Sequence, residues 1–217
     1  HLIHHIRIGM VRVQQRHPVA QQDRSGLEPG AGVSLMAAAP SVFSETAYAK
    51  INLALHVRAR RADGYHVLET LFAFAEDGDR IALAAADAST FAITGPFAAG
   101  LEAGGDNLVT RAAAAFGRHF GIDAHHAITL HKALPIASGI GGGSADAAAT
   151  LRALARLHGI APDHPDLFAI AAGLGADVPA CLLGRTALGY GKGDELAGIA
   201  GLPGRPLLLV NPGVAVS

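Results

Sequence analysis

The sequence predicts an α+β fold in which a β-rich first half leads to a glycine-rich loop and a helical second half. Three observations support this prediction. Apolar residues alternate with other residues from Ala47 to Val57, which is the pattern of a β-strand. The segment Pro135–Ala149 holds four glycines, three of them consecutive. An alanine-rich segment without a helix breaker continues from this loop as far as Gly159, and it predicts a helix.

The composition limits the classes of protein that need to be considered. With 217 residues, the chain is long enough for one large domain or two small ones. Its net charge of -1 gives no reason to expect nucleic-acid binding. A single cysteine, Cys181, excludes an internal disulfide and fits a reducing compartment. Because no run of eighteen apolar residues occurs, no transmembrane helix is expected, and we predict a cytoplasmic protein.

Residues 1–40 differ from the rest of the chain. They contain a histidine cluster at His1, His4 and His5 and a polar stretch with proline and glycine. Metal binding by the histidines is one interpretation, and a leader or disordered extension is the favoured one. The organised domain is therefore expected to cover residues 41–217.

The first predicted strand carries two polar groups on one face. Ala47 and Ala49 begin a set of apolar residues that should form a packed face, whereas Lys50 and Asn52 belong to the opposite face. Their side chains point the same way, about 7 Å apart along the strand. This pair suggests a functional site, although an ordinary solvent-facing lysine is the alternative.

Turn signals divide the rest of the first half into short strands. Asp63-Gly64 marks a turn, and Asp77-Gly78 marks another. Strands are expected at residues 67–75, 80–84 and 90–94, which together make a β-rich meander.

The second half should alternate helices and strands. Asp106 is expected to cap a helix that ends at Gly121, and Asp163 to cap a helix from Pro165 to Leu174. A strand at 127–132 should lead into the glycine loop, and strands at 186–190 and 207–210 should close the chain.

The glycine loop and the helix after it form a predicted phosphate site. A helix N-terminus exposes unpaired N–H groups and carries a partial positive charge, and glycines let the backbone approach an anion closely. A Walker A loop is excluded because no lysine lies between Gly139 and Ala149. A dinucleotide fingerprint is incomplete because Ser144 occupies its third glycine position. A flexible turn is the remaining alternative.

Asp177 is the carboxylate that most requires an explanation. It lies in Gly173-Leu-Gly-Ala-Asp-Val-Pro179, beside apolar residues, where an unpartnered carboxylate is costly. It could cap a helix or turn, or it could act as a catalytic carboxylate beside bound phosphate.

The order of these motifs resembles the GHMP kinase superfamily over residues 44–217. The segments that carry the resemblance are Ala49-Lys-Ile-Asn-Leu53, Arg61-Ala-Asp-Gly-Tyr-His66, Glu69-Thr-Leu-Phe72, Asp106-Asn-Leu108, Pro135–Ala149 and Leu174-Gly-Ala-Asp-Val-Pro179. The first two segments are specific to the branch that phosphorylates 4-diphosphocytidyl-2-C-methyl-D-erythritol. The resemblance implies a fold like domain 2 of ribosomal protein S5, with an ATP-binding N-terminal lobe and a cleft between two lobes.

The resemblance also implies roles for individual residues. Lys50 and Asp177 match the catalytic pair, and Asn52, Tyr65 and His66 match positions on the substrate side. The remaining matches, all on the ATP side, are Asn107, Lys132, Pro135, Ile136, Ala137, Ser138, Gly139, Ile140, Gly141, Gly142, Gly143, Ser144 and Ala145. Ser138 and Ala145 depart from the usual loop pattern, but both side chains are small.

The implied reaction is transfer of the γ-phosphate of ATP to the 2-hydroxyl of 4-diphosphocytidyl-2-C-methyl-D-erythritol, in non-mevalonate isoprenoid biosynthesis. ATP would bring Mg²⁺, held mainly by its phosphates with Ser144 as a contact, because the sequence shows no separate metal-ligand cluster. The expected partner is therefore this small molecule, not nucleic acid or a membrane, and the expected state is a monomer or homodimer.

The end of the chain departs from the superfamily pattern. In the superfamily, a C-terminal lobe carries a third glycine motif, and this lobe has no counterpart here. The resemblance therefore implies a chain that is cut short and catalytically weak on its own. Two alternatives stay open. One is another GHMP kinase, acting on mevalonate, homoserine or a sugar, against which Tyr65 and His66 argue. The other is a nucleotide-binding module without catalysis.

Overall fold

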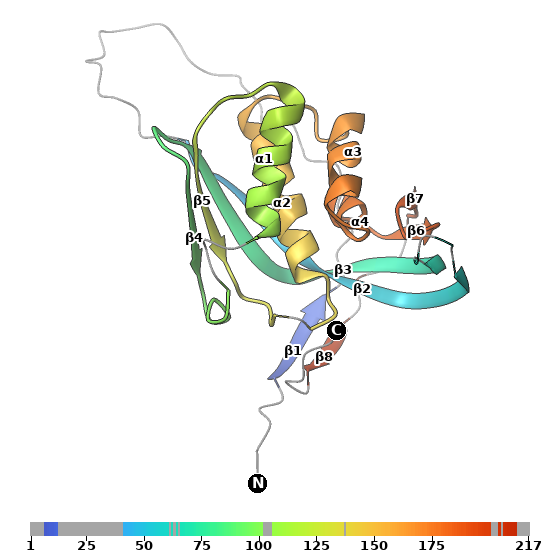
Figure 1. The fold of residues 1–217 in the computed structure, drawn as a ribbon. Helices are drawn as coiled ribbons and strands as arrows, with labels where there is room; N and C mark the ends of the chain where they lie inside the picture. Colours follow the sequence, from blue (N-terminus) through green and yellow to red (C-terminus); the bar gives the residue numbers. More distant parts are fainter. Residues whose placement is uncertain are drawn as a thin grey trace, which may run out of the picture.

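A computed structural model describes residues 7–12, 41–60, 62, 64, 66–101, 106–136, 138–200, 204 and 206–211. Strands and helices both contribute, which confirms the predicted α+β class (Figure 1). In chain order the elements are β1 (Arg7–Arg12), β2 (Phe43–Arg60), β3 (His66–Ala85), β4 (Thr90–Thr94), α1 (Leu108–Phe120), β5 (His126–His131), α2 (Gly142–Leu157), α3 (Pro165–Leu174), α4 (Val178–Leu183), β6 (Ala187–Tyr190), β7 (Glu195–Gly198) and β8 (Pro206–Asn211).

The main sheet has the strand order β4-β5-β3-β6-β7, with β2 paired to β3. Its pairs are antiparallel except β4 with β5, which run parallel and are connected along the chain through α1. A second, two-stranded sheet joins β1 to β8, with Arg7 opposite Asn211. β1 thus lies inside the predicted leader, whose other residues, including His1, His4 and His5, are outside the described part of the chain.

The first strand is confirmed and is longer than expected, but the turn predicted at Asp77-Gly78 is wrong. β3 runs without interruption through this pair, so the strands predicted at 67–75 and 80–84 are one strand. The reason is a close approach between strands. A Cβ added to Gly78 would stand 2.3 Å from the carbonyl oxygen of Ala47, so glycine is needed here for space and not for a turn.

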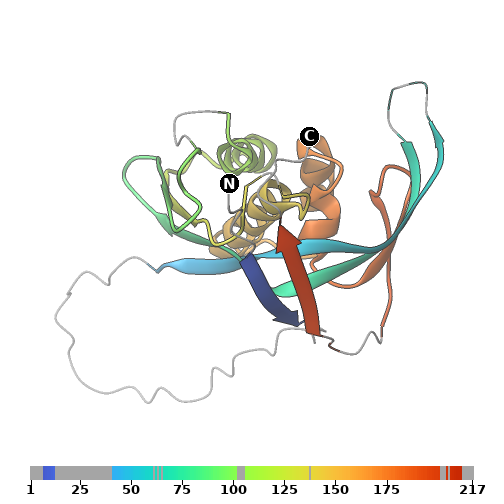
Figure 2. The same cartoon turned by 90° about the horizontal axis from the view of Figure 1, so that it is seen from below.

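The face of β2 that was predicted to be packed is buried only in the first half of the strand. Ala47 and Ala49 are fully buried, but Leu53, Leu55 and Val57 are 45%, 52% and 62% exposed. The outer halves of β2 and β3 run beyond the helices as a ribbon, so none of the helices in the described residues covers them (Figures 1 and 2). The register also shifts between Asn52 and Ala54, which leaves Leu53 without an opposite residue in β3.

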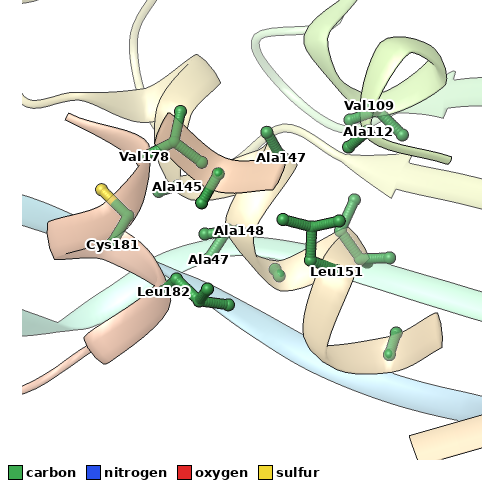
Figure 3. Close-up of a cluster of buried hydrophobic side chains, with 14 of the residues drawn as sticks. Ala47, Val109, Ala112, Ala145, Ala147, Ala148, Leu151, Val178, Cys181 and Leu182 are labelled. Carbon is green, nitrogen blue, oxygen red and sulfur yellow. The ribbon is translucent and has the colours of Figure 1, made fainter. Parts of the chain in front are cut away.

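The helices lie together on one face of the sheet, and α2 forms the centre of the core (Figure 1). Its alanines Ala147, Ala148 and Ala149 are fully buried, and their small side chains let neighbouring backbones approach closely. Figure 3 shows Leu151 of α2 in the same cluster as Ala47 of β2 and Val178 of α4. The core therefore fixes the start of α2 against β2.

Two helix caps differ from the prediction by one residue. Asn107, not Asp106, caps α1, because its side-chain oxygen accepts a hydrogen bond from the N–H of Val109 at 2.9 Å. His164, not Asp163, caps α3. The described chain also contains three elements that were not predicted, β1, α4 and β7. None of the helices in the described part of the chain is long and apolar enough to cross a membrane.

Candidate functional site

The glycine loop is attached to β2 through the backbone of Lys50. The N–H of Lys50 donates a hydrogen bond to the carbonyl oxygen of Ile140 at 2.9 Å. This N–H is free to do so because the β2–β3 register is irregular between Tyr48 and Lys50. Gly141 then takes a left-handed conformation, with φ of 67°, at the cap of α2. The loop thus presents the N-terminus of a sixteen-residue helix beside the Lys50 side chain.

A cavity of about 370 Å³ opens between this loop and α1, and we name it the loop cavity. Most residues predicted on the ATP side line it: Asn107, Lys132, Pro135, Ile136, Ser138, Gly139, Gly141, Gly142, Gly143 and Ser144. Ala137 lies outside the described residues. Ile140 and Ala145 do not line the cavity, because Ile140 bonds to β2 and the side chain of Ala145 belongs to the core.

Lys132 supports the loop cavity through a buried charge cluster. Its side chain is 4% exposed, and its ammonium contacts Asp79 and, at 3.0 Å, Asp146 Oδ2. The other oxygen of Asp79 accepts hydrogen bonds from the N–H groups of Ala133 and Leu134, at 2.6 and 2.8 Å. This cluster therefore ties β3 and α2 to the segment that leads into the glycine loop.

The two carboxylates of this cluster are not equivalent. Asp79 has three donors, whereas Asp146 Oδ1 is buried and has no hydrogen-bond partner among the described residues. Burial raises the pKa of Asp146 to about 7; the nearby Asp79 carboxylate adds to this, and Lys132 opposes it. Asp146 is thus the member of the cluster that takes up a proton near neutral pH.

The predicted catalytic pair lies next to the loop. Lys50 Nζ is 3.3 Å from Asp177 Oδ2; the lysine side chain is 4% exposed and the aspartate 43%. Lys50 Nζ also donates to Asn52 Oδ1 at 2.8 Å and lies 5.1 Å from the centre of the Phe72 ring. Asp177 occupies the cap position of α4, but its side chain makes no capping hydrogen bond. The carboxylate thus faces Lys50 instead of serving the helix.

A second cavity, of about 390 Å³, lies where the ribbon approaches Asp177, and we name it the ribbon cavity. His66 and Asp177 both line it, and Tyr65 lies outside the described residues. Ser144 lines the loop cavity as well as the ribbon cavity. The two cavities therefore meet at the first turn of α2, beside the Lys50–Asp177 pair.

The structure adds Lys192 to the ribbon cavity, which the sequence prediction missed. Lys192 lies in a turn between Gly191 and Gly193, both with positive φ, and its N–H donates to Asp194 Oδ1 at 3.1 Å. The carbonyl oxygen of Gly191 accepts a hydrogen bond from the N–H of Leu68 in the ribbon. The Gly-Lys-Gly-Asp sequence between apolar segments was the available signal for this turn.

This arrangement provides the elements that phosphoryl transfer requires. The chemistry depends on placing two substrates in line and on stabilising negative charge. An anion-binding helix start lies beside one cavity, and a carboxylate held by an ammonium lies beside the other. Within the described residues, no group of three or more histidine, cysteine or acidic side chains could hold a metal ion by itself.

The chain is similar in sequence to known kinases, as the arrangement of the site suggests. The family of GHMP kinases N terminal domains matches residues 107–185. The 4-diphosphocytidyl-2-C-methyl-D-erythritol kinase of Rhizorhabdus wittichii is 58% identical over 177 residues, which is 80% of this chain and 60% of that protein. The kinase of the same name from Parvibaculum lavamentivorans is 52% identical, with the same shares of coverage. The chain thus spans about 60% of the length of these relatives.

The chain is also similar to solved structures of kinases. A crystal structure of 4-(cytidine 5'-diphospho)-2C-methyl-D-erythritol kinase matches with a TM-score of 0.60 and 44% identity, over 74% of this chain and 56% of that one. A phosphomevalonate kinase from Streptococcus pneumoniae matches with a TM-score of 0.53 and 12% identity, over 70% of this chain and 48% of that one. The second match concerns the fold alone.

Proposed function

The chain belongs to the GHMP kinases, with homologues among the 4-diphosphocytidyl-2-C-methyl-D-erythritol kinases, and we propose that it serves the reaction those relatives are named for. In this proposal the γ-phosphate of ATP is transferred to the 2-hydroxyl of 4-diphosphocytidyl-2-C-methyl-D-erythritol, in the non-mevalonate route to isoprenoid precursors. The acceptor is a small molecule. We also propose that the protein works in the cytoplasm, as a monomer or homodimer.

The observation that supports this proposal most directly is the position of the Lys50–Asp177 pair. The pair lies where the loop cavity and the ribbon cavity meet at Ser144. A nucleotide in the loop cavity would direct its last phosphate toward this meeting point. A hydroxyl group in the ribbon cavity would lie beside Asp177.

The two charged residues have complementary roles in this proposal. Asp177 accepts a hydrogen bond, and then the proton, from the attacking hydroxyl group. Lys50 holds Asp177 in place and stabilises negative charge on the transferring group. Asn52 holds the Lys50 ammonium, while His66, together with Tyr65, would contact the cytidine end of the acceptor.

ATP would enter with Mg²⁺, and the residues present fit a phosphate-bound ion. Ser144 lines both cavities, and the helix start offers N–H groups to phosphate oxygens. The ion would neutralise charge on the phosphates when bound. Most of its ligands would be phosphate oxygens and water.

The test is ADP release from Mg-ATP, measured with and without 4-diphosphocytidyl-2-C-methyl-D-erythritol. Because the chain spans about 60% of its relatives, the assay is run on this chain and on a chimera that adds the unmatched part of the Rhizorhabdus wittichii kinase. Acceptor-dependent release is expected, strongest in the chimera. Asp177→Asn should lower kcat by a factor of about 10² to 10⁴. The control, Asp166→Asn, removes a carboxylate that pairs with His119 and should leave kcat unchanged.

Three other results would overturn the proposal. Release that depends on mevalonate, homoserine or a sugar, and not on the cytidine compound, would identify a different GHMP kinase. Saturable ATP binding without release for any of these acceptors would identify a nucleotide-binding module. Full activity in Asp177→Asn would remove the assigned base.

A further inference from the structure

A chain of three hydrogen bonds leads from Lys50 into the sheet. Lys50 Nζ donates to Asn52 Oδ1 at 2.8 Å, and Asn52 Nδ2 donates to Thr70 Oγ1 at 2.7 Å. Thr70 Oγ1 in turn donates to the carbonyl oxygen of Ala54 at 2.9 Å. Thr70 is 4% exposed, so water does not compete for its hydroxyl group.

The directions of these bonds are linked. A hydroxyl group has one proton, and Thr70 gives it to Ala54, so Thr70 Oγ1 offers only an acceptor to Asn52. The amide of Asn52 must then turn its NH₂ group to Thr70 and its oxygen to Lys50. An asparagine amide has no intrinsic preference between its two orientations. Two partners fix the orientation here, because Thr70 offers an acceptor and the Lys50 ammonium offers only donors.

A local irregularity of the strands makes this arrangement available. Asn52 lies opposite Phe72 and Ala54 opposite Leu71, so Leu53 is an extra residue in β2. Such a bulge disturbs the ladder and redirects backbone groups locally. The carbonyl oxygen of Ala54 here receives the hydroxyl group of Thr70, which lies opposite Leu55.

We propose that Thr70 is a positioning residue for phosphoryl transfer: it fixes the Asn52 amide so that its oxygen holds the Lys50 ammonium beside Asp177. This inference rests on the function proposed above for Lys50. Two of the three ammonium protons then face Asn52 and Asp177, and the third is left for the transferring phosphate. Without the Thr70 hydroxyl, the NH₂ group of Asn52 loses its acceptor, so the hydrogen bond that anchors the amide on the side away from the ammonium is gone and the amide oxygen can move off Lys50 Nζ.

The first test compares Thr70→Val with Thr70→Ser. Valine keeps the shape but removes the hydroxyl group, and kcat should fall about tenfold, while KM for ATP changes less than about twofold. Serine keeps the hydroxyl group and should restore kcat to within about twofold. The matched control is Thr150→Val, because Thr150 is also buried and its hydroxyl group also donates to a backbone carbonyl, that of Asp146. This control should lower stability to a similar extent without the loss in kcat.

A double-mutant cycle separates positioning from a structural role. If Thr70 acts through Asn52, Thr70→Val should lower kcat by less than about twofold in an Asn52→Ala background. A full tenfold loss in that background, or wild-type kcat in Thr70→Val alone, would overturn the assignment.

A second readout does not depend on turnover. The side-chain amide of Asn52, assigned by its absence in Asn52→Ala, should give slowly exchanging NMR signals in the wild type and faster exchange in Thr70→Val. If neither the chain nor the chimera releases ADP, the proposed kinase function fails, and this signal alone decides whether Thr70 holds the amide. An Asn52 amide that is unchanged in Thr70→Val would refute the inference in either case.

Discussion

Gly141 lies directly against the side chain of Lys50. A Cβ added to Gly141 would stand 3.1 Å from Lys50 Cε and 3.3 Å from Lys50 Cβ. Gly141 also has a φ of 67°, a conformation that other L-residues adopt at a cost. The glycine therefore serves the loop in two ways, through its backbone and through the space it leaves for the lysine.

Gly141→Ala should accordingly lower both stability and activity. The left-handed backbone costs about 1–2 kcal/mol, and the crowded lysine is displaced from Asp177. The control is Gly159→Ala, because Gly159 has the same φ of 67° but no atom within 4 Å of an added Cβ. Urea unfolding should show a loss in both variants, whereas kcat should fall only in Gly141→Ala. Equal kcat in the two would mean that the contact with Lys50 is unimportant.

Asp146 should make the stability of the protein depend on pH. Its pKa is about 7 in the folded chain, above the usual value near 3.8, so folding takes up a proton between these two values. The resulting stabilisation is present at low pH and is lost as the pH rises toward 7. Two histidines, His126 and His158, have pKa values lowered by burial and act in the opposite direction, so the wild type alone does not isolate the effect.

The comparison that isolates Asp146 is with Asp146→Asn. Between pH 5 and pH 8, the free energy of unfolding of the asparagine variant should rise relative to the wild type by roughly 2.5 kcal/mol, since about two pH units lie below the Asp146 pKa in this range and each is worth about 1.4 kcal/mol. Asp106→Asn is the control, because the Asp106 side chain is 80% exposed. A constant difference between wild type and Asp146→Asn across this range would show that Asp146 does not take up the proton.

Arg152 should contribute more to stability than its neighbour Arg156. Its guanidinium reaches Glu45, the carbonyl oxygen of Thr46 and the carbonyl oxygen of Cys181, and so joins α2 to β2 and α4. Arg152→Met removes the arginine donor from the two carbonyl oxygens and one of the two arginine partners of Glu45, and it should cost about 2–3 kcal/mol in thermal or urea unfolding. Arg156 also pairs with Glu45 but is 55% exposed, so Arg156→Met should cost less than about 1 kcal/mol. Equal losses would contradict this account.

Lys192 should affect the binding of the acceptor and not the binding of the nucleotide. It lines the ribbon cavity with Asp177 and His66, and its ammonium lies 3.7 Å from Asp194. If the proposed acceptor places its diphosphate there, Lys192→Met should raise KM for the acceptor roughly tenfold, the size of one charge-assisted hydrogen bond. KM for ATP should not change, and Lys192→Arg should keep most of the acceptor affinity. An equal rise in both KM values would place Lys192 outside the acceptor site.

The sequence predicted the parts of the site that follow from local chemistry. The glycine run, the alanine-rich helix and the period-two pattern around Lys50 are all visible within short windows. The long-range partners were not visible in the same way. Asp79, whose carboxylate accepts a hydrogen bond from Lys132, lies 53 residues earlier in the chain. It follows Asp77-Gly78, a pair that is typical of turns but lies within β3 here.

The role of Thr70 was hidden for a related reason. Its partner Ala54 accepts its hydrogen bond only because the register shifts at Leu53, and a register shift depends on two strands at once. The exposed outer half of β2 was misjudged because alternation indicates which residues share a face. It does not indicate whether another layer covers that face.

The two cavities differ in what holds their walls in place. The loop cavity rests on α2 and the buried cluster at Lys132, whereas His66 stands at the end of a ribbon whose exposed side is covered by none of the other described elements. Ordering the ribbon around a bound acceptor costs conformational entropy that ATP binding does not incur. Warming should therefore weaken acceptor binding more steeply than nucleotide binding, and the loss should appear first as a rise in KM for the acceptor, well below the temperature at which the core unfolds.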